Sequence, residues 1–401
     1  MPYARKVVTF AYYGSVPFSS QNMKIAQVAP LFESVPPHAY GGTERVVSYL
    51  TEGLVAQGHE VTLFASGDSK TGAELVSVVE RSLRLDPRQP DWMMAHTCLI
   101  DQVFSQAHRF DVMHFHIDCL HYPLARRCPT PCVTTLHGRL DLPDLVPLHA
   151  QFDDHPLVSI SNSQRAPLPH ARWCATVYHG LPQSLYRFVP DPDDFFAFVG
   201  RISPEKRVDR AIEIAIACNT RLRIAAKVDP VDRAYFEREI EPLLNHPLIE
   251  YVGEIGDADK NEFIGRARLL LFPIDWPEPF GLVMIEALAC GTPVVAYDCG
   301  SASEVIQHGT SGYLVHNQRE AIEAARAIDR IDRRHCREAF DRRFTAAKMA
   351  SRYVDVYRSL IDARRDLVDD TAPRTLRAGE ARPLRLVAKR PTTSNSLRTI
   401  E

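Results

Sequence analysis

Short apolar runs alternate with amphipathic segments along the whole chain. Within these runs, nearly every position is apolar, so side chains facing both sides of a strand would be buried. This pattern is typical of parallel sheets whose two faces are covered by helices. The runs that predict strands are 24–29, 61–66, 111–116, 132–137, 157–161 and 175–180, and later 195–200, 221–226, 249–253, 269–274 and 292–298.

The segments between the runs have helical periodicity. In 204–218 the apolar residues recur at intervals of three and four, which places them on one stripe of a helix facing a sheet. These residues are Val208, Ala211, Ile212, Ala215 and Ile216. Further helices are expected at 42–57, 230–244 and 257–267, and a helical region at about 319–366.

The alternation of strands and helices starts twice, on either side of a connector rich in Pro and Asp at 182–194. The pattern therefore predicts an α/β protein with two doubly wound Rossmann-like domains and a cleft between the carboxyl ends of their strands. We expect an N-terminal extension at 1–22, a first domain at 23–188, a second at 189–347, a helix at about 348–366 that packs back on the first domain, and a disordered basic tail at 371–401.

Composition narrows the class of protein. The chain has 401 residues, of which 45% are hydrophobic and 24% charged, and its formal net charge is -3. These values are typical of a globular protein and give no indication of nucleic-acid binding. No apolar run is long enough to span a bilayer, so membrane contact would be at most peripheral, through the basic tail, and a solvated tail is the simpler alternative. The scattered cysteines and the lack of a convincing signal peptide favour a cytoplasmic protein.

The stretch EPFGLVMIEALACGTPVVA places Glu286 in a run that is apolar on every face of a helix. A buried ionised carboxylate needs hydrogen-bond donors, and the vicinal hydroxyls of a ribose are suitable donors. The alternative is a Glu286 paired with a buried Arg or Lys. Gly281 lies at the start of this helix, where unpaired backbone N–H groups favour a phosphate.

Two cations lie near the end of a predicted strand in FVGRISPEKRVD. Arg201 follows Gly200, and Lys206 follows Ser203-Pro204 at a helix start. Doubly wound sheets bind ligands at this edge, and the two cations would neutralise a diphosphate. The alternative is a pair of surface cations, although the helix dipole disfavours cations at that position.

Weaker signals come from the first half of the chain. Gly41 and Gly42 precede a helix and would let backbone approach a ligand, although Gly-Gly is often only a turn. His137 ends an apolar strand and faces the same cleft, where a structural role is as plausible as a functional one. The histidine cluster HFHIDCLH at 114–121 could hold a metal ion, but a strand end that opens into a polar loop explains it more simply.

In combination these motifs resemble glycosyltransferase family 4, the retaining, nucleotide-sugar-dependent transferases of GT-B fold. The resemblance runs from about Lys24 to about Tyr357. Its most specific part is Glu278-Pro279-Phe280-Gly281-Leu282 followed by Glu286. The segments GTPVV at 291–295, GSASEV at 300–305, FVGRISPEK at 198–206 and GGTE at 41–44 also fit.

The resemblance implies a role for each matching residue. Arg201 and Lys206 would bind the donor diphosphate and stabilise the leaving group, and Glu286 would bind the ribose. Glu278, Phe280, Gly281 and Leu282 would hold the transferred sugar and the distal phosphate. Gly42 would line the phosphate, His137 would lie by the donor sugar, and Lys227 is a further candidate contact. Such enzymes usually need no metal and no cofactor, because the Arg/Lys pair supplies the positive charge.

Two departures affect the substrates more than the fold. The family commonly has Gly after Lys206, where this chain has Arg207, and a Gly-rich turn where this chain has 227–230, KVDP.

The implied function is a retaining, metal-independent transfer of a sugar, with UDP-glucose as the first guess for the donor, to an unidentified saccharide, lipid-linked sugar or small molecule. The alternatives are a GT-B sugar-nucleotide epimerase and a non-catalytic sugar-nucleotide-binding protein.

Overall fold

The fold is given by a computed structural model, which describes residues 22–38, 41–88 and 90–371. The predicted N-terminal extension and basic tail lie outside these residues, except for Asn22 and Thr371. Described residues up to Ile361 belong to one compact unit, and those from Asp362 on belong to a second.

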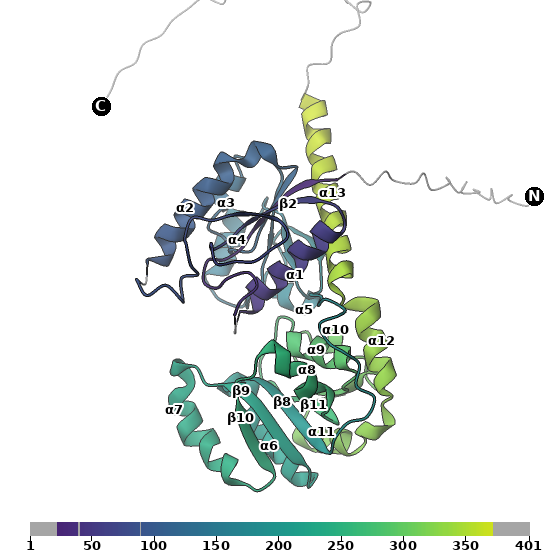
Figure 1. The fold of residues 1–401 in the computed structure, drawn as a ribbon. Coiled ribbons are helices and arrows are strands. Elements are labelled where there is room, and N and C mark those ends of the chain that lie inside the picture. Colours follow the sequence, from purple (N-terminus) through teal and green to yellow (C-terminus); the bar gives the residue numbers. More distant parts are fainter. Residues whose placement is uncertain (1–21, 39–40, 89, 372–401) are drawn as a thin grey trace, which may run out of the picture. The chain divides into compact units, whose positions relative to one another are not determined.

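The first half of the chain forms a seven-stranded parallel sheet with the order β3-β2-β1-β4-β5-β6-β7 (Figure 1). Its strands are β1 (Lys24–Val28), β2 (Glu60–Phe64), β3 (Glu74–Val76), β4 (Val112–Phe115), β5 (Cys132–Thr135), β6 (Leu157–Ser159) and β7 (Trp173–Thr176). Its helices are α1 (Gly42–Ala56), α2 (Trp92–Ser105), α3 (Tyr122–Ala125), α4 (Leu145–Gln151) and α5 (Asn162–Arg165).

The second half forms a six-stranded parallel sheet with the order β10-β9-β8-β11-β12-β13. Its strands are β8 (Phe195–Arg201), β9 (Arg221–Lys227), β10 (Ile249–Gly253), β11 (Leu269–Phe272), β12 (Val294–Tyr297) and β13 (Gly312–Val315). Its helices are α6 (Val208–Ala217), α7 (Arg233–Tyr235), α8 (Asp257–Gly265), α9 (Leu282–Cys290), α10 (Ala302–Val305), α11 (Gln318–Arg326) and α12 (Arg333–Arg343).

Both sheets reverse their strand order beside their first strand. The chain adds strands on one side of β1 and then continues with β4 on the other side, and it does the same with β8 and β11. In doubly wound folds, ligands bind in the crevice outside the carboxyl ends of the strands at this reversal. The loops that follow these four strands are therefore the expected position of the site.

Two predicted helices differ from the structure. The segment predicted as one helix at 204–218 is a 3₁₀ turn at Pro204–Lys206 followed by α6, because Arg207 between them adopts a left-handed conformation with φ 52°. The segment 230–244 divides into short helical pieces at Pro230–Asp232, Arg233–Tyr235, Phe236–Ile240 and Glu241–Asn245. Pro242 contributes to this division, because it has no N–H to donate within a helix. The short strands β3 and β13 were not predicted.

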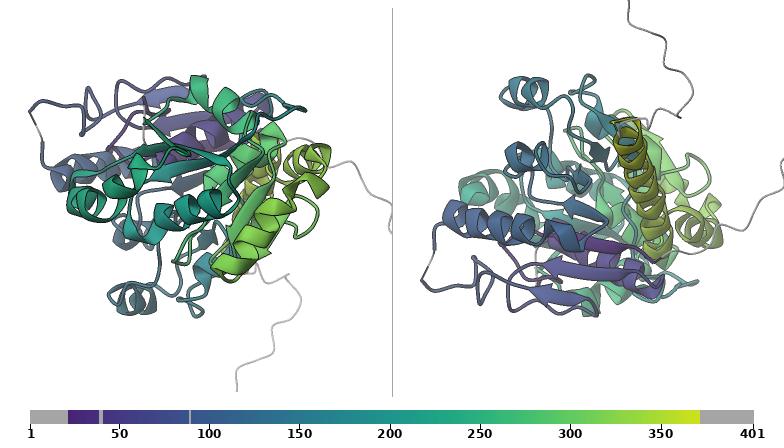
Figure 2. Two further views of the ribbon diagram at one scale, coloured as in Figure 1. Left: turned by 90° about the horizontal axis from the view of Figure 1, so that it is seen from below. Right: turned by 90° about the horizontal axis from the view of Figure 1, so that it is seen from above.

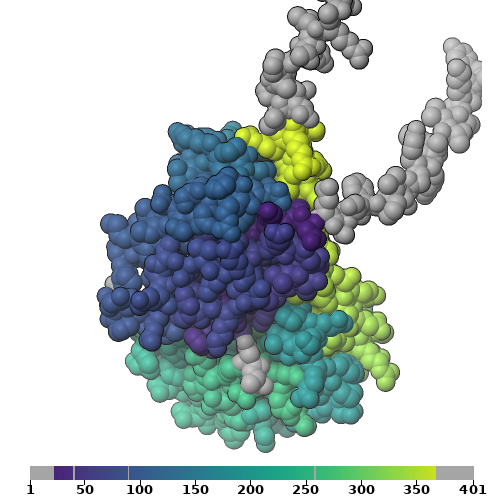
Figure 3. All heavy atoms as spheres, turned by 45° about the horizontal axis from the view of Figure 1, so that its top comes forward, coloured from purple at the N-terminus to yellow at the C-terminus, as the bar shows by residue number. Residues whose placement is uncertain are grey.

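The last helix, α13 (Ala346–Thr371), contributes side chains to the core beneath the first sheet. Its residues Met349, Tyr353 and Tyr357 are buried and belong to the same apolar cluster as Ile25 of β1 and Val112 of β4. Figure 2 shows the part of the helix up to Ile361 running past the strands of this sheet, and Figure 3 shows this part at the surface beside the purple atoms from the start of the described chain. Two of its tyrosines reach polar groups near the carboxyl ends of the strands, which connects the helix to the site described below.

Among the described residues, no helix is long and apolar enough to cross a bilayer.

Candidate active site

A cavity of about 1260 Å³ lies at the carboxyl ends of the strands that flank the two strand-order reversals. Residues after β1 and β4 line it from the first sheet, and residues at the end of β8 and after β11 line it from the second. All ten residues to which the sequence assigned a role line this one cavity. They are Gly42, His137, Arg201, Lys206, Lys227, Glu278, Phe280, Gly281, Leu282 and Glu286.

The start of α9 depends on two glycines. Gly281 precedes the helix with φ 75°, a left-handed conformation that favours glycine, and a Cβ there would lie 3.0 Å from the Phe272 ring. Gly300 has φ 62°, and a Cβ there would lie 2.3 Å from the backbone nitrogen of Glu278. The backbone N–H of Ser301 donates to the carbonyl of Glu278 at 3.0 Å. The Gly300-Ser301 segment thus positions Glu278 at the cavity wall.

Glu286 has a lysine as its partner. It is 3% exposed, and the Nζ of Lys260 in α8 lies 3.0 Å from its Oε1 and 3.3 Å from its Oε2. The sequence analysis offered two kinds of partner for this carboxylate, ribose hydroxyls or a buried Arg or Lys. The structure shows a lysine at this position. Both residues line the cavity, so the Glu286 carboxylate remains at a position where a ligand can approach it.

Lys206 pairs with the second acidic residue of the motif. Its Nζ forms an ion pair with Oε2 of Glu278, and the indole N–H of Trp276 donates to the same oxygen at 3.0 Å. The ammonium also lies 5.2 Å from the Trp276 ring centroid and 5.9 Å from that of Phe272. Aromatic faces stabilise a cation at such distances, so Lys206 is held at the cavity by one carboxylate and two rings.

Arg201 lies among three carboxylates. Its guanidinium is 2.5 Å from Glu205, 3.6 Å from Asp229 and 3.5 Å from Asp232. Lys227 lies 2.9 Å from Asp229 and, by hydrogen bonding, lowers the pKa of that carboxyl. A polyanion that binds Arg201 therefore competes with these acids for the guanidinium.

Arg207, which stands where the family commonly has glycine, has a left-handed backbone conformation of the kind that glycine adopts most easily. Arg207 has φ 52° and ψ 50°, and its guanidinium is held by Asp209 at 2.7 Å and by Asp275 at 2.8 Å. A left-handed conformation costs a non-glycine residue about 1 kcal/mol. The two ion pairs offset part of this cost, and the turn that positions Lys206 is kept.

Gly42 and His137 lie on the side of the cavity formed by the first sheet. A Cβ at Gly42 would meet no atom within 4 Å, so the space above it is open. A hydrogen bond of 2.8 Å joins His137 Nε2 and His116 Nδ1. The His137 ring also stacks on that of His179, with centroids 5.3 Å apart. The His179 ring meets Phe280 edge-on at 4.9 Å, which brings His137 close to the motif before α9.

The histidine cluster at 114–121 is part of the polar core. His114 lies 2.7 Å from the Thr135 hydroxyl, and His121 lies 2.8 Å from that of Thr134. Among the described residues, no group of three or more His, Cys, Asp or Glu side chains is arranged to hold a metal ion. The strand end that opens into a loop, the simpler interpretation of this sequence, is what β4 and its following loop show.

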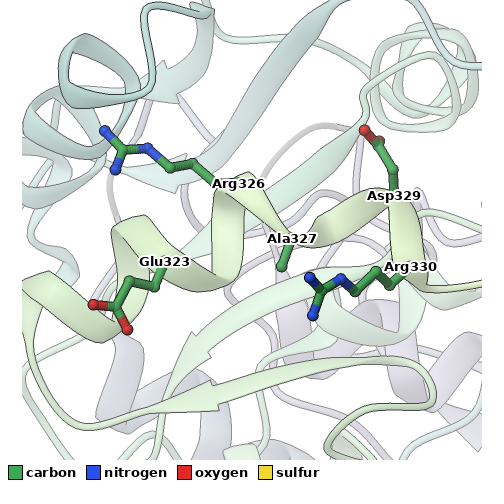
Figure 4. Close-up of a pocket in the computed structure, with 5 residues that line it drawn as sticks. All are labelled: Glu323, Arg326, Ala327, Asp329 and Arg330. Carbon is green, nitrogen blue, oxygen red and sulfur yellow. The ribbon is translucent and has the colours of Figure 1, made fainter.

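A second hollow lies away from these residues. It is lined by Glu323, Arg326, Ala327, Asp329 and Arg330 at the end of α11 and the turn after it (Figure 4). Arg326 donates to the carbonyl of Ala217 at 2.8 Å, and Asp329 pairs with Arg268 at 2.7 Å. These side chains serve as links between surface elements, and the hollow contains none of the motif residues.

Comparison with known proteins agrees with this arrangement. The sequence family "Glycosyltransferase Family 4" matches residues 40–189, and the family "Glycosyl transferases group 1" matches residues 187–340. The chain belongs to glycosyltransferase family 4. The two matches meet at the connector between the sheets, and the activity that the family shares is glycosyl transfer.

Two relatives align with this family 4 enzyme over most of their length. It is 25% identical over 355 residues to an uncharacterised glycosyltransferase of Methanocaldococcus jannaschii, with 77% of this chain and 89% of that one covered. It is 23% identical over 368 residues to N-acetyl-alpha-D-glucosaminyl L-malate synthase of Bacillus anthracis, with 79% and 93% covered.

Solved structures establish the fold as GT-B. Sucrose-phosphate synthase of Thermosynechococcus elongatus superposes with a TM-score of 0.70 at 18% identity, covering 85% of this chain and all of that one. Anabaena HepE in complex with UDP and glucose superposes with a TM-score of 0.64 at 17% identity, covering 84% and 100%. The prediction of two doubly wound domains in a GT-B arrangement is confirmed.

Several residues at the site were not predicted. Lys260 lies in a polar helix segment that carries no motif, and Trp276 lies two residues before Glu278 without matching a quoted pattern. His116 was considered as a metal ligand or as part of a strand end, and His179 was assigned no role. Both histidines lie at the ends of predicted strands, 111–116 and 175–180, so a search for polar residues in the last two positions of each predicted strand would have found them.

The pairing of Lys260 with Glu286 leads to a prediction for stability. Lys260→Met should lower the free energy of unfolding by about 3 kcal/mol, because it leaves a buried carboxylate without a counter-charge. Adding Glu286→Gln to this variant should restore part of the loss, and urea denaturation of the four proteins of the double-mutant cycle would measure the coupling. Additive effects of the two substitutions would contradict the pairing.

Buried neutral histidines make stability depend on pH. Burial lowers the pKa of His137 and His155 to about 3, and it lowers the pKa of His114, His116, His121 and His179 well below 6.5. The unfolded chain therefore binds protons below about pH 6.5 that the folded chain does not bind.

The free energy of unfolding should therefore fall as the pH falls from about 6.5 towards 5, by up to about 1.4 kcal/mol per pH unit for each such histidine. Urea denaturation at several pH values would measure the slope, which His155→Asn should reduce. A free energy of unfolding that stays constant over this range would contradict the burial of these histidines in their neutral form.

Proposed function

We propose that this enzyme transfers a hexosyl group from a nucleoside diphosphate sugar, with UDP-glucose as the first candidate, to a hydroxyl group of an acceptor, with retention of the anomeric configuration. The observation that carries the proposal is the convergence of Arg201, Lys206, Glu278 and Glu286 on one cavity. The resemblance to family 4 enzymes assigns these four residues to the donor. Crystal structures of the similarly folded HepE contain UDP and UDP-glucose, which is consistent with a uridine donor.

The diphosphate would bind between the cations and the start of α9. The departing nucleoside diphosphate gains negative charge as the glycosidic bond breaks, and fixed cations and helix N–H groups stabilise such charge. Arg201 and Lys206 are held at the cavity by carboxylates, so the diphosphate would take the place of these carboxylates beside the two cations. Lys206 would leave Glu278, whose carboxylate would then accept hydrogen bonds from the sugar hydroxyls.

The ribose would bind at Glu286. Lys260 approaches both carboxylate oxygens from α8, and each oxygen retains a lone pair that can accept a ribose hydroxyl. Because Lys260 supplies a counter-charge to this buried carboxylate, the side chain is positioned before the ligand arrives. Glu286 would thus contribute to nucleotide binding and not to proton transfer.

The two acidic residues are not the acid and nucleophile of a glycosidase. Glu278 and Glu286 each form an ion pair with a lysine, and both are assigned to ligand hydroxyls. Retention would arise from attack on the same face from which the diphosphate leaves. The cations would supply the charge stabilisation without a metal ion. A cytoplasmic location is also part of this proposal, and the nine cysteines scattered along the chain are consistent with it.

Lys206→Ala tests the assignment of the diphosphate. It should weaken binding of UDP-glucose at least tenfold, about 1.4 kcal/mol, and lower kcat/KM by about 10²-fold or more, since a fixed charge at the leaving group is lost. Titration calorimetry and UDP release with a panel of saccharide acceptors would measure the two effects. The control is Lys348→Ala, an exposed lysine of α13, and near-normal kinetics of Lys206→Ala would remove the assignment.

Stereochemistry tests the mechanism. Proton NMR of the first-formed product should show a new linkage with the same anomeric configuration as the donor, in buffer that contains a chelator. An inverted linkage would refute front-face attack, and epimerised donor without an acceptor would favour an epimerase.

A further inference from the structure

Five polar side chains form a continuous hydrogen-bonded series behind the cavity. His137 Nε2 lies 2.8 Å from His116 Nδ1, and His116 Nε2 lies 3.0 Å from the Gln27 carbonyl oxygen. The Gln27 amide N–H donates to the Tyr357 hydroxyl at 2.9 Å, and this hydroxyl lies 2.8 Å from His114 Nδ1. Gln27, His114 and Tyr357 are completely buried, so the series has no access to bulk water along most of its length.

The Gln27 amide gives this series a direction. Its nitrogen faces Tyr357, so its oxygen, which can only accept, faces His116. His116 must therefore carry its proton on Nε2, and because burial keeps this ring neutral, its Nδ1 is a lone pair. That lone pair accepts the Nε2–H of His137.

The direction determines what His137 offers to a ligand. With its proton on Nε2, the other ring nitrogen of His137, Nδ1, is a lone pair. Among the described residues, this buried Nδ1 has no hydrogen-bond partner, and the ring lines the cavity. The reverse direction would leave a buried N–H without a partner, and unpaired buried N–H groups are rarer in proteins than unpaired acceptors.

We propose that Gln27 and His116 are positioning residues that fix His137 as the Nε2–H tautomer, so that its Nδ1 accepts a hydrogen bond from a ligand hydroxyl. On the proposed function this hydroxyl belongs to the transferred sugar. The tautomer itself is a property of the ligand-free protein and does not depend on which substrate the enzyme uses. Tyr357 of α13 helps to orient the Gln27 amide, since its hydroxyl accepts the Gln27 N–H.

The tautomers can be observed directly. Long-range proton–nitrogen correlation spectra of ligand-free protein labelled with ¹⁵N-histidine at neutral pH distinguish Nε2–H from Nδ1–H rings, and the variants His116→Asn and His137→Asn assign the signals. Both rings should be Nε2–H in the wild type. Nδ1–H rings at both positions would overturn the proposal.

Variants of Gln27 test whether this residue determines which ring nitrogens of His116 and His137 carry the protons. Gln27→Met is nearly isosteric but removes the acceptor. Either direction then leaves one buried N–H and one ring lone pair without a partner, so the two rings should become a mixture of both tautomers. Gln27→Glu can only accept, so both rings should remain Nε2–H. The control is Tyr353→Phe, which removes a hydroxyl of α13 that contacts Thr135 and not Gln27, and should leave both tautomers unchanged. Rings that stay entirely Nε2–H in Gln27→Met would also overturn the proposal.

Binding distinguishes this inference from the proposed function. Gln27→Met should weaken UDP-glucose binding by up to about tenfold, because His137 Nδ1 is no longer fixed as the acceptor of a sugar hydroxyl. UDP, which lacks the transferred sugar, should bind as to the wild type. Equal weakening for both ligands would contradict a contact with the sugar. A wild-type protein that binds neither ligand, but has both rings as Nε2–H, would refute the proposed donor and leave the tautomer assignment intact.

Discussion

A carboxylate that is taken out of water must find a counter-charge or hydrogen-bond donors, and two such carboxylates flank the start of α9. Glu278 is held by Lys206 and Trp276, and Glu286 by Lys260. These pairs fix the side chains before any ligand is present. They also create competition, because a diphosphate that binds Lys206 or Arg201 must take the place of protein carboxylates. Ligand binding therefore replaces ion pairs within the protein by ion pairs to the diphosphate. The released carboxylates can then accept hydrogen bonds, which favours a polyanion that also carries hydroxyl groups.

The first sheet contributes to the same cavity with neutral groups. Its histidines are kept uncharged by burial, and their hydrogen bonds continue through Gln27 to Tyr357 of α13. The two halves also meet through Glu304 of the GSASEV motif, whose carboxylate accepts the backbone N–H groups of Asn162 and Ser163 at 2.8 and 2.7 Å. The chain thus joins its two sheets by polar contacts close to the cavity, where the relative position of the halves determines the geometry of the site.

Much of this arrangement could be predicted from the sequence, because strand and helix periodicity is local and because the Glu278 to Glu286 motif combines a helix start with two acids at fixed spacing. The ends of strands β1, β4, β8 and β11 followed from the same pattern. The partners of the charged residues could not be predicted in this way. Lys260 reaches Glu286 only because α8 packs beside α9, and Tyr357 lies 330 residues from Gln27. Arg207 illustrates a third kind of limit, since its left-handed backbone is accompanied by ion pairs to Asp209, two residues further on, and to Asp275 of a distant segment.

The central claim is that the cations and the buried acid act together on one nucleoside diphosphate sugar. Titration calorimetry of the wild type and of Glu286→Ala with UDP-, GDP- and ADP-sugars tests it most directly. The account predicts that one class of nucleotide sugar binds the wild type and that the variant loses at least tenfold in affinity for it, about 1.4 kcal/mol. Binding of no nucleotide sugar to the wild type, or equal affinity in the variant, would contradict it.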